Sequence, residues 1–488
     1  MFQHIAVYVA IAYRPSLYAF SLTSKACYKA SLSLLWQQIS ITVHDREGLR
    51  GDVDRLIKAI SRTESSYHVQ HITIKGALRL NAKKTKEGYS RLTPWLVTSG
   101  LIEILDEESV SYHGLYAVYN EPVIEKSSEE DIAWAPLVNF LQANTHLKDL
   151  VYDCQSQLPP SLLRVLHEQH PQCRLHHLSF RFRTLLWGVP YPYEMELATS
   201  PSLYRVKLAC ARRDSDGDDD FNSEAVMELT TGLAPNLKEV TILNLLPARS
   251  LSSVRPRGSW QGLPGFTSEK VGSLTSLSLK GVSRLETPTI LQNWARYTDF
   301  TCLQHLALGG GHDAKTSGLS GETMAWVARN YSFPQLKTLS VYLTRDHLSH
   351  ERPHYSEHAV SFFQAFESLE ELSIDGPIDS KILATILSHH GQTLRRLSLH
   401  PFEEPAIDTS RDLQDIPLEF TEDLVLQIET QCPVLEELVI PVKRNKSSAS
   451  EAEMYRCFGR MKSLRFLFPY SGLFELAGHS RQQLQSQI

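Results

Sequence analysis

The fold is predicted from two stretches, Leu369-Glu370-Glu371-Leu372-Ser373-Ile374 and Leu394-Arg395-Arg396-Leu397-Ser398-Leu399. Both follow the pattern Leu-x-x-Leu-x-Leu, whose last three places alternate apolar, polar and apolar, as in a half-buried strand. Between them, Asp379 can cap a helix whose apolar residues at 382, 383, 386 and 387 share one face, and Gly391 can end it. The repeating unit is therefore a strand, a loop, a helix and a loop.

The same hexad recurs through most of the 488 residues, if other aliphatic residues are allowed in place of leucine. An isolated earlier copy is Val69/Ile72/Ile74. Since one such unit cannot bury its own apolar face, the units must stack on one another, which predicts parallel strands on one face and helices on the other. Eleven copies, with first leucines 25 to 41 residues apart, begin at Leu147, Leu175, Leu203, Leu237, Leu274, Leu303, Leu336, Leu369, Leu394, Leu435 and Leu464.

This arrangement resembles the leucine-rich-repeat family, in its long irregular form. The resemblance implies an α/β solenoid. Many members of the family carry Asn or Cys three residues after the third aliphatic, and this chain has other residues there, such as Pro377 and Phe402. An α/β domain of another type with leucine-rich strands is the alternative.

The first forty residues are of a different kind. They contain Pro15-Ser16-Leu17, the run Leu22-Thr23-Ser24-Lys25, and Leu34-Leu35-Trp36 followed by Ile39. In this order they resemble the second half of an F-box, a small helical knot that docks on a Skp-type adaptor. By that resemblance, the adaptor-binding residues are Ile5, Leu17, Leu22, Ser24, Lys25, Leu35 and Trp36.

The opening Leu-Pro and acidic residue typical of F-boxes lie upstream of the matched part in the family, so we expect an N-terminally incomplete F-box. The alternative for this segment is an amphipathic helical cap over the open end of the repeat array. We expect an all-α F-box-like segment over 1–45, a connecting region with at least one repeat-like strand over 46–133, irregular repeats over 134–475 and a polar tail over 476–488.

The combination is similar to F-box and leucine-rich-repeat proteins of filamentous fungi. It implies the substrate-receptor subunit of an SCF-type (Skp-cullin-F-box) ubiquitin ligase, which binds a Skp-type adaptor and, through it, cullin and RING subunits. The target protein would bind to the sheet. The alternative is a leucine-rich-repeat interaction scaffold without a ubiquitin role.

Residues at the third and fifth places of each hexad are expected on the exposed face of the sheet. Arg and Lys near the start and Glu near the end predict a polarised strip, which would favour a partner of opposite polarity. The predicted substrate-binding residues are His177, Arg205, Lys207, Glu239, His305, Thr338, Glu371, Arg396 and Glu437.

Other functional classes find little support. Catalytic motifs such as G-x-S-x-G, a P-loop and H-E-x-x-H are absent from the sequence, and no cofactor is expected. A net charge of −6 does not favour nucleic acid, and no apolar run reaches the ~20 residues that span a membrane. Seven scattered cysteines fit a cytoplasmic or nuclear protein. His167, His170, Cys173, His176 and His177 cluster in sequence, but we expect no metal site there.

Three polar stretches interrupt the repeats, at 214–220, 255–259 and 443–448. The acidic first stretch has its glycine in the wrong place for a calcium loop. We expect all three to be solvated loops.

Overall fold

The computed structural model describes residues 1–80, 123–185, 190, 192–211, 213, 218–245, 256–267, 270–281, 287–310, 318–345, 354–401, 418, 420–442 and 449–470. These residues form a mixed α/β fold with a single sheet of 13 parallel strands, which pair in the order of the sequence. The strands are β1 (Gln38–Asp45), β2 (His71–Arg79), β3 (Asp149–Cys154), β4 (Arg174–His177), β5 (Leu203–Ala211), β6 (Glu239–Leu245), β7 (Ser276–Gly281), β8 (His305–Leu308), β9 (Thr338–Tyr342), β10 (Glu371–Gly376), β11 (Arg396–Pro401), β12 (Glu437–Pro441) and β13 (Phe466–Tyr470).

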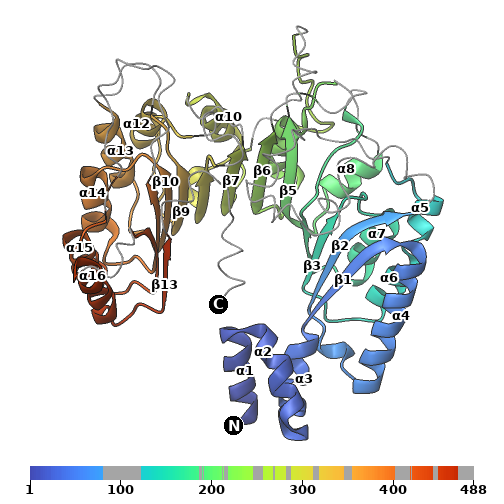
Figure 1. Ribbon diagram of the computed structural model, residues 1–488. Coiled ribbons are helices and arrows are strands. Elements are labelled where there is room, and N and C mark those ends of the chain that lie inside the picture. The colour runs from blue at the N-terminus through green and yellow to red at the C-terminus, as the bar shows by residue number, and fades with distance from the viewer. Residues whose placement is uncertain are drawn as a thin grey trace, which may run out of the picture.

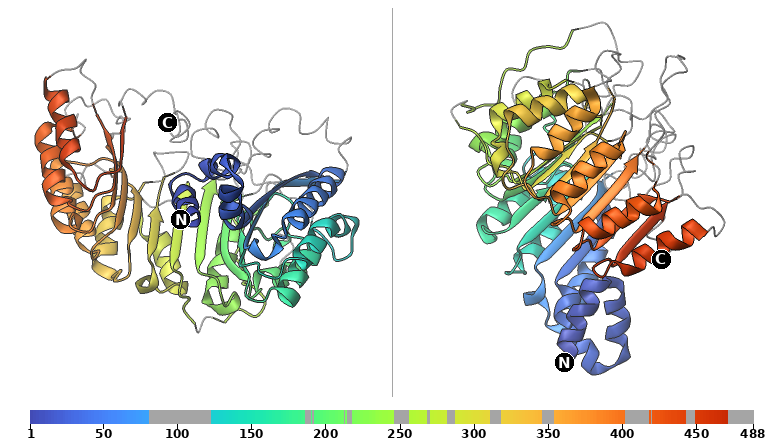
Figure 2. Two further views of the ribbon diagram at one scale, coloured as in Figure 1. Left: turned by 90° about the horizontal axis from the view of Figure 1, so that it is seen from below. Right: turned by 90° about the vertical axis from the view of Figure 1, so that its left-hand side faces the viewer.

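The sheet bends into an arch with its strands on the inner side and helices on the outer side (Figure 1, Figure 2). In the parts of the chain that are described, no helix has the length and apolarity needed to span a membrane. The helices that follow or precede the strands are α4 (Arg46–Thr63), α5 (Glu129–Ile132), α6 (Ala135–Gln142), α7 (Pro160–Gln169), α8 (Pro192–Ala198), α9 (Asn222–Glu228), α10 (Thr289–Tyr297), α12 (Gly321–Asn330), α13 (Tyr355–Gln364), α14 (Ser380–His390), α15 (Glu422–Gln431) and α16 (Ala449–Arg460).

The repeated leucines build the core between sheet and helices. Leu339, Leu372, Leu397, Leu438 and Leu467 lie opposite one another on β9 to β13, in unbroken register. The first four of them are buried, as are the leucines that begin each of these hexads except the last. The parallel strands predicted on one face, with helices on the other, are thus present.

The predicted helix signals also hold for α14. The Asp379 carboxylate accepts a hydrogen bond from the backbone N–H of Ile382 at 2.7 Å, so it caps the helix. Gly391 follows the last residue of the helix with an ordinary right-handed φ of −52°. A Cβ at this position would lie 2.3 Å from the Leu387 carbonyl oxygen and 2.6 Å from that of Gln431. Glycine is therefore required there by close packing and not by a left-handed backbone.

The sheet begins earlier than the repeat pattern predicts. The helical segment expected over 1–45 ends at Trp36, and Gln38–Asp45 forms β1, which pairs with β2. Ile39, Ile41 and Val43 alternate with exposed residues and are buried, a strand pattern that carries no leading leucine. The long helix α4 then connects β1 to β2 within the expected connecting region. The tail expected over 476–488 lies outside the described residues.

Three helices precede the sheet: α1 (Phe2–Ala12), α2 (Arg14–Thr23) and α3 (Lys25–Trp36). They pack around a small core of their own, formed by Ala6, Leu17 and Ala30 and separate from the main core. The three helices lie beyond the amino-terminal ends of the first strands (Figure 1, Figure 2). We call this unit the N-terminal knot.

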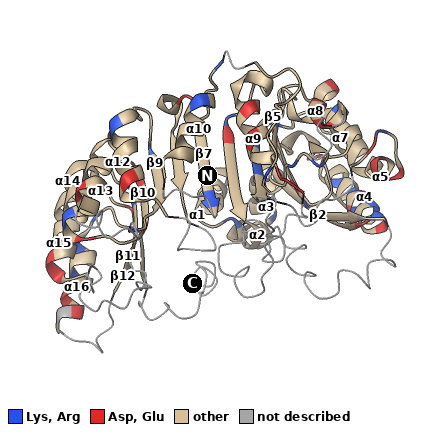
Figure 3. Ribbon diagram, turned by 90° about the horizontal axis from the view of Figure 1, so that it is seen from above, with Lys and Arg blue, Asp and Glu red and all other residues tan. Residues whose placement is uncertain are grey.

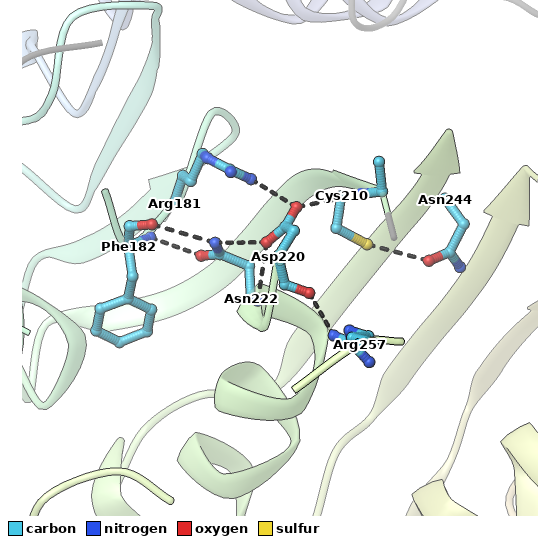
Figure 4. Close-up of polar contacts among 8 residues, drawn as sticks. Arg181, Phe182, Cys210, Asp220, Asn222, Asn244 and Arg257 are labelled. Carbon is cyan, nitrogen blue, oxygen red and sulfur yellow. Dashed lines mark hydrogen bonds and ion pairs between the residues drawn. The ribbon is translucent and has the colours of Figure 1, made fainter. Parts of the chain in front are cut away.

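Parts of two inserts that we expected to be solvated loops pack against each other instead. Asp220 is buried and its carboxylate accepts a hydrogen bond from Arg181 at 2.9 Å, while the Asp220 carbonyl accepts one from Arg257 (Figure 4). The Arg257 guanidinium lies 4.4 Å from the centroid of the Phe221 ring, and that ring stacks on Trp260. The expectation is wrong for these residues because hydrogen bonds join the two inserts, from Arg257 to the Asp220 carbonyl and from the Gly258 N–H to the Asp219 carboxylate at 2.7 Å.

Candidate protein-interaction surfaces

One continuous row of side chains crosses the inner face of the sheet, with one residue from each strand in register. Every member of this inner row is exposed or half-buried. From β1 to β13 the inner row consists of Ser40, Thr73, Val151, His176, Arg205, Glu239, Ser276, His305, Thr338, Glu371, Arg396, Glu437 and Phe466.

Most of the predicted substrate-binding residues lie in this row. Lys207 lies on the same face, two residues after Arg205 on β5. The structure thus brings the predicted residues together on one surface. Those in the inner row are Arg205, Glu239, His305, Thr338, Glu371, Arg396 and Glu437.

His177 is the exception and lies on the core side of the sheet, 2% exposed. Its ring packs edge-on against Tyr152 and Phe180. A register shift between Leu175 and His176 moves β4 by one place relative to β5, so that His176 takes the place on the inner face. Burial, followed by the positive charge of Arg183, lowers the pKa of His177 to about 3. His177 therefore contributes to the core and not to a binding surface.

The charges on the inner face alternate in sign instead of forming the predicted polarised strip. Arg205 on β5 lies 3.5 Å from the Glu239 carboxylate on β6. Arg396 lies between two carboxylates, 3.3 Å from Glu371 and 3.5 Å from Glu437. The helices likewise carry both signs intermixed (Figure 3). A partner would meet local ion pairs and not a field of one sign.

A polar cluster that the sequence did not reveal lies at the amino ends of β2 to β4. The Asp149 carboxylate, largely buried, accepts hydrogen bonds from Arg174 at 2.7 and 3.0 Å. His176 contacts the same carboxylate at 2.9 Å, and so does His71. Burial alone would raise the pKa of Asp149, but the hydrogen bonds from Arg174 and His176 outweigh it and hold the pKa below its usual value. Only the cross-strand register brings these residues together.

A cavity of about 350 Å³ opens on the inner face beside this cluster. It is formed by β1 to β3 together with the residue that follows β4. Its lining combines hydroxyl, charged and aliphatic groups: Ser40, Thr73, Lys75, Val151, Asp153 and Leu178. Its size is at the lower end of the range for small-molecule sites.

The N-terminal knot forms the second candidate surface. Its helices expose large apolar side chains, and Leu22 is the most exposed of them at 86%. Soluble proteins seldom expose many large apolar side chains together unless a partner covers them. The exposed apolar residues of the knot are Met1, Phe2, Ile5, Val7, Tyr8, Ile11, Tyr13, Tyr18, Leu22 and Tyr28.

The predicted adaptor-binding residues divide between this surface and the interior. Leu17 is completely buried in the core of the knot, and Leu35 packs against the same core. Trp36 packs against the main core beneath the sheet and joins the knot to it. Leu17 therefore offers no surface to a partner, whereas Leu35 and Trp36 are half-buried.

The remaining predicted residues are accessible. Ser24 caps α3, since its hydroxyl accepts a hydrogen bond from the Cys27 N–H at 3.1 Å. Lys25 follows it and is exposed, as are Ile5 and Leu22. A partner that binds the knot would therefore meet Ile5, Leu22 and Lys25.

The histidines and the cysteine clustered near residue 170 point to separate partners. The His167 ring contacts the Ser200 hydroxyl at 2.7 Å, and the His170 ring contacts the Leu141 carbonyl at 3.0 Å. Among the described residues, no group of three or more His, Cys, Asp or Glu side chains is arranged to hold a metal ion.

Comparison with known proteins gives no assignment. No protein-family model matches the chain, and no curated protein sequence matches it either.

Proposed function

We propose that the chain is a non-catalytic receptor subunit of an SCF-type ubiquitin ligase. The N-terminal knot would act as the F-box and bind a Skp-type adaptor, which links to cullin and RING subunits. The inner face of the sheet would hold the target protein. Such a subunit performs no chemistry itself. It holds the target protein close to another enzyme, which carries out the reaction.

One observation carries this proposal: the knot has its own core and an apolar surface outside the arch. Ala6, Leu17 and Ala30 pack inside it, while Ile5 and Leu22 point outward. A small helical unit that satisfies its own core does not need those outward residues for folding. Their exposure is best explained by a partner.

We also propose that the α/β fold is a leucine-rich-repeat solenoid. A helix lies between the strands of most successive hexads, and each strand pairs with its neighbours in the sequence, with β1 and β13 at the two edges of the sheet. This order is what stacked repeats require, because each unit then contacts only its neighbours. It supports an irregular leucine-rich-repeat solenoid preceded by an F-box-like knot.

The test is capture of a purified Skp-type adaptor, with and without cullin, by the full chain. Leu22→Asp should abolish capture, because it places a charge in the exposed apolar surface without disturbing the core. Ile132→Asp is the matched control, since Ile132 is 54% exposed on α5 and far from the knot in sequence. If the unaltered chain captures no adaptor, the ligase role is lost.

A second candidate is a protein-interaction scaffold without a ubiquitin role. The burial of Leu17 favours it, because this residue matched to the F-box is then unavailable to an adaptor, and Leu35 is half-buried against the same core. The scaffold role predicts that a protein bound to the inner face is captured equally well by the chain and by its Leu22→Asp variant, with no adaptor in either complex.

A further inference from the structure

The cavity on the inner face of β1 to β3 has a donor set suited to an anion. Ser40 and Thr73 are cross-strand neighbours in the inner row, and Lys75 follows Thr73 by two residues on the same face of β2. Neighbouring strands lie about 4.8 Å apart and alternate residues about 6.6 Å apart. The two hydroxyl groups and the ammonium group thus surround one small space.

None of these three donors is used by the protein in the part of the chain that the structure describes. The Lys75 ammonium forms no ion pair there, and the hydroxyl groups of Ser40 and Thr73 form no hydrogen bonds. The neighbouring polar cluster differs, since Asp149 is fully engaged by Arg174, His176 and His71. Unused donors around a cavity are the arrangement that an oxyanion satisfies.

The lining carries one cation, Lys75, which matches an anion of one negative charge. Asp153 lies opposite Lys75 in the register of β2 and β3, so one carboxylate already faces the cavity. A dianion such as phosphate would meet only one full positive charge. A carboxylate can bind Lys75 and the two hydroxyl groups on the side away from Asp153.

The remaining wall of the cavity is apolar and indicates that a hydrocarbon group is attached to the carboxylate. Val151 and Leu178 line the cavity on the β3 and β4 side, opposite Ser40 on β1. We propose that this cavity binds an aliphatic carboxylate, with its oxygens on Ser40, Thr73 and Lys75 and its hydrocarbon part on Val151 and Leu178. The ligand is either a free carboxylic acid or the carboxyl terminus of a polypeptide with an apolar last residue.

This inference goes beyond the proposed function and does not depend on adaptor binding. If the carboxylate is the carboxyl terminus of a polypeptide, the cavity would allow the inner face to recognise a target protein by its C-terminal residue. The adaptor capture described above tests the knot, whereas ligand binding tests the cavity, so either can fail alone.

The experiment is titration calorimetry of the full chain with two probes, hexanoate and the dipeptide acetyl-Gly-Leu with a free carboxyl group. The matched controls are hexanamide and acetyl-Gly-Leu amide, which keep the shape and lose the charge. At least one carboxylate should bind, and its amide should bind at least about tenfold more weakly, as expected for loss of a charge-assisted hydrogen bond. Tighter binding of the dipeptide would identify the ligand as a polypeptide terminus. Tighter binding of hexanoate would identify it as a free carboxylic acid.

Variants locate the site. Lys75→Met keeps most of the side-chain length and should weaken carboxylate binding by about tenfold or more. Lys58→Met removes a cation from the exposed side of α4 and should leave binding unchanged. Equal binding of acid and amide, equal binding by the Lys75→Met variant, or no binding of either acid would overturn the proposal.

Discussion

Asp149 on β3 accepts two hydrogen bonds from Arg174 on β4, at 2.7 and 3.0 Å, in a two-pronged contact that ties neighbouring strands together. The side chain of Asp149 is only 7% exposed, whereas that of Arg174 is 51% exposed. Two-pronged contacts between arginine and a carboxylate are among the stronger polar interactions in proteins. The relationship fixes the amino ends of the strands that border the cavity.

Asp149→Asn should therefore destabilise the protein by about 1–3 kcal/mol, because it weakens a largely buried pair and leaves Arg174 without its counter-charge. Its effect should also depend on pH. The folded state holds the pKa of Asp149 below the ordinary value of about 3.9, so its contribution is present above that pH and is lost as the pH falls below it. Urea unfolding at pH 7 and pH 3 should show a smaller difference between variant and parent at pH 3. A difference that grows on acidification would contradict this account of Asp149.

His177 should make the protein sensitive to mild acid. Its pKa of about 3 in the folded state lies far below the value of about 6.5 in an unfolded chain. The unfolded state then binds more protons between pH 6.5 and pH 3, so stability falls as the pH is lowered through that window. His177→Phe keeps the aromatic contacts with Tyr152 and Phe180 and should reduce this fall. If the free energy of unfolding falls with pH equally in parent and variant, His177 is not the cause of the acid sensitivity.

The knot should lose stability independently of the sheet when its core is opened. Leu17→Ala removes a completely buried side chain and should cost the knot about 2–5 kcal/mol. Leu22→Ala, at an exposed site of the same helix, should change stability by less than about 0.5 kcal/mol. Amide hydrogen exchange should report faster exchange in α1 to α3 for the first variant only, with β5 to β12 unchanged. Equal effects of both variants would mean that Leu17 does not hold the knot together.

Gly391 should not tolerate a side chain, although its backbone is ordinary. Gly391→Ala places a methyl group against the carbonyl oxygens of Leu387 and Gln431 and should cost about 1–3 kcal/mol through forced displacement. Gly459→Ala is the matched control in α16, where a Cβ meets nothing within 4 Å. That change should be neutral or stabilising by up to about 1 kcal/mol. Thermal unfolding of the two variants separates steric cost from helix propensity.

The strands of the repeats could be predicted from sequence because burial on one face imposes a period of two residues. The pattern around Leu372 and Leu397 therefore predicts both the strands and that these two side chains face the core. Ile39, Ile41 and Val43 have the same period, but they follow directly on the helical knot and lack the leading leucine, so β1 was not distinguished from the segment before it.

Contacts between distant residues could not be predicted. The register shift after Leu175 exchanges the roles of His176 and His177, and it depends on how β4 meets β5 in space. The alternation of Arg396 with its two carboxylates likewise follows from register. The contact of Arg257 with the Asp220 backbone spans 37 residues and joins two inserts that sequence alone leaves separate.

Docking of a Skp-type adaptor on the knot, as proposed above, can be measured by sedimentation velocity of the full chain mixed with purified adaptor. We expect a one-to-one complex for the unaltered chain and for Ile132→Asp, and free components for Leu22→Asp. Free components for the unaltered chain, or a complex that survives Leu22→Asp, would contradict it.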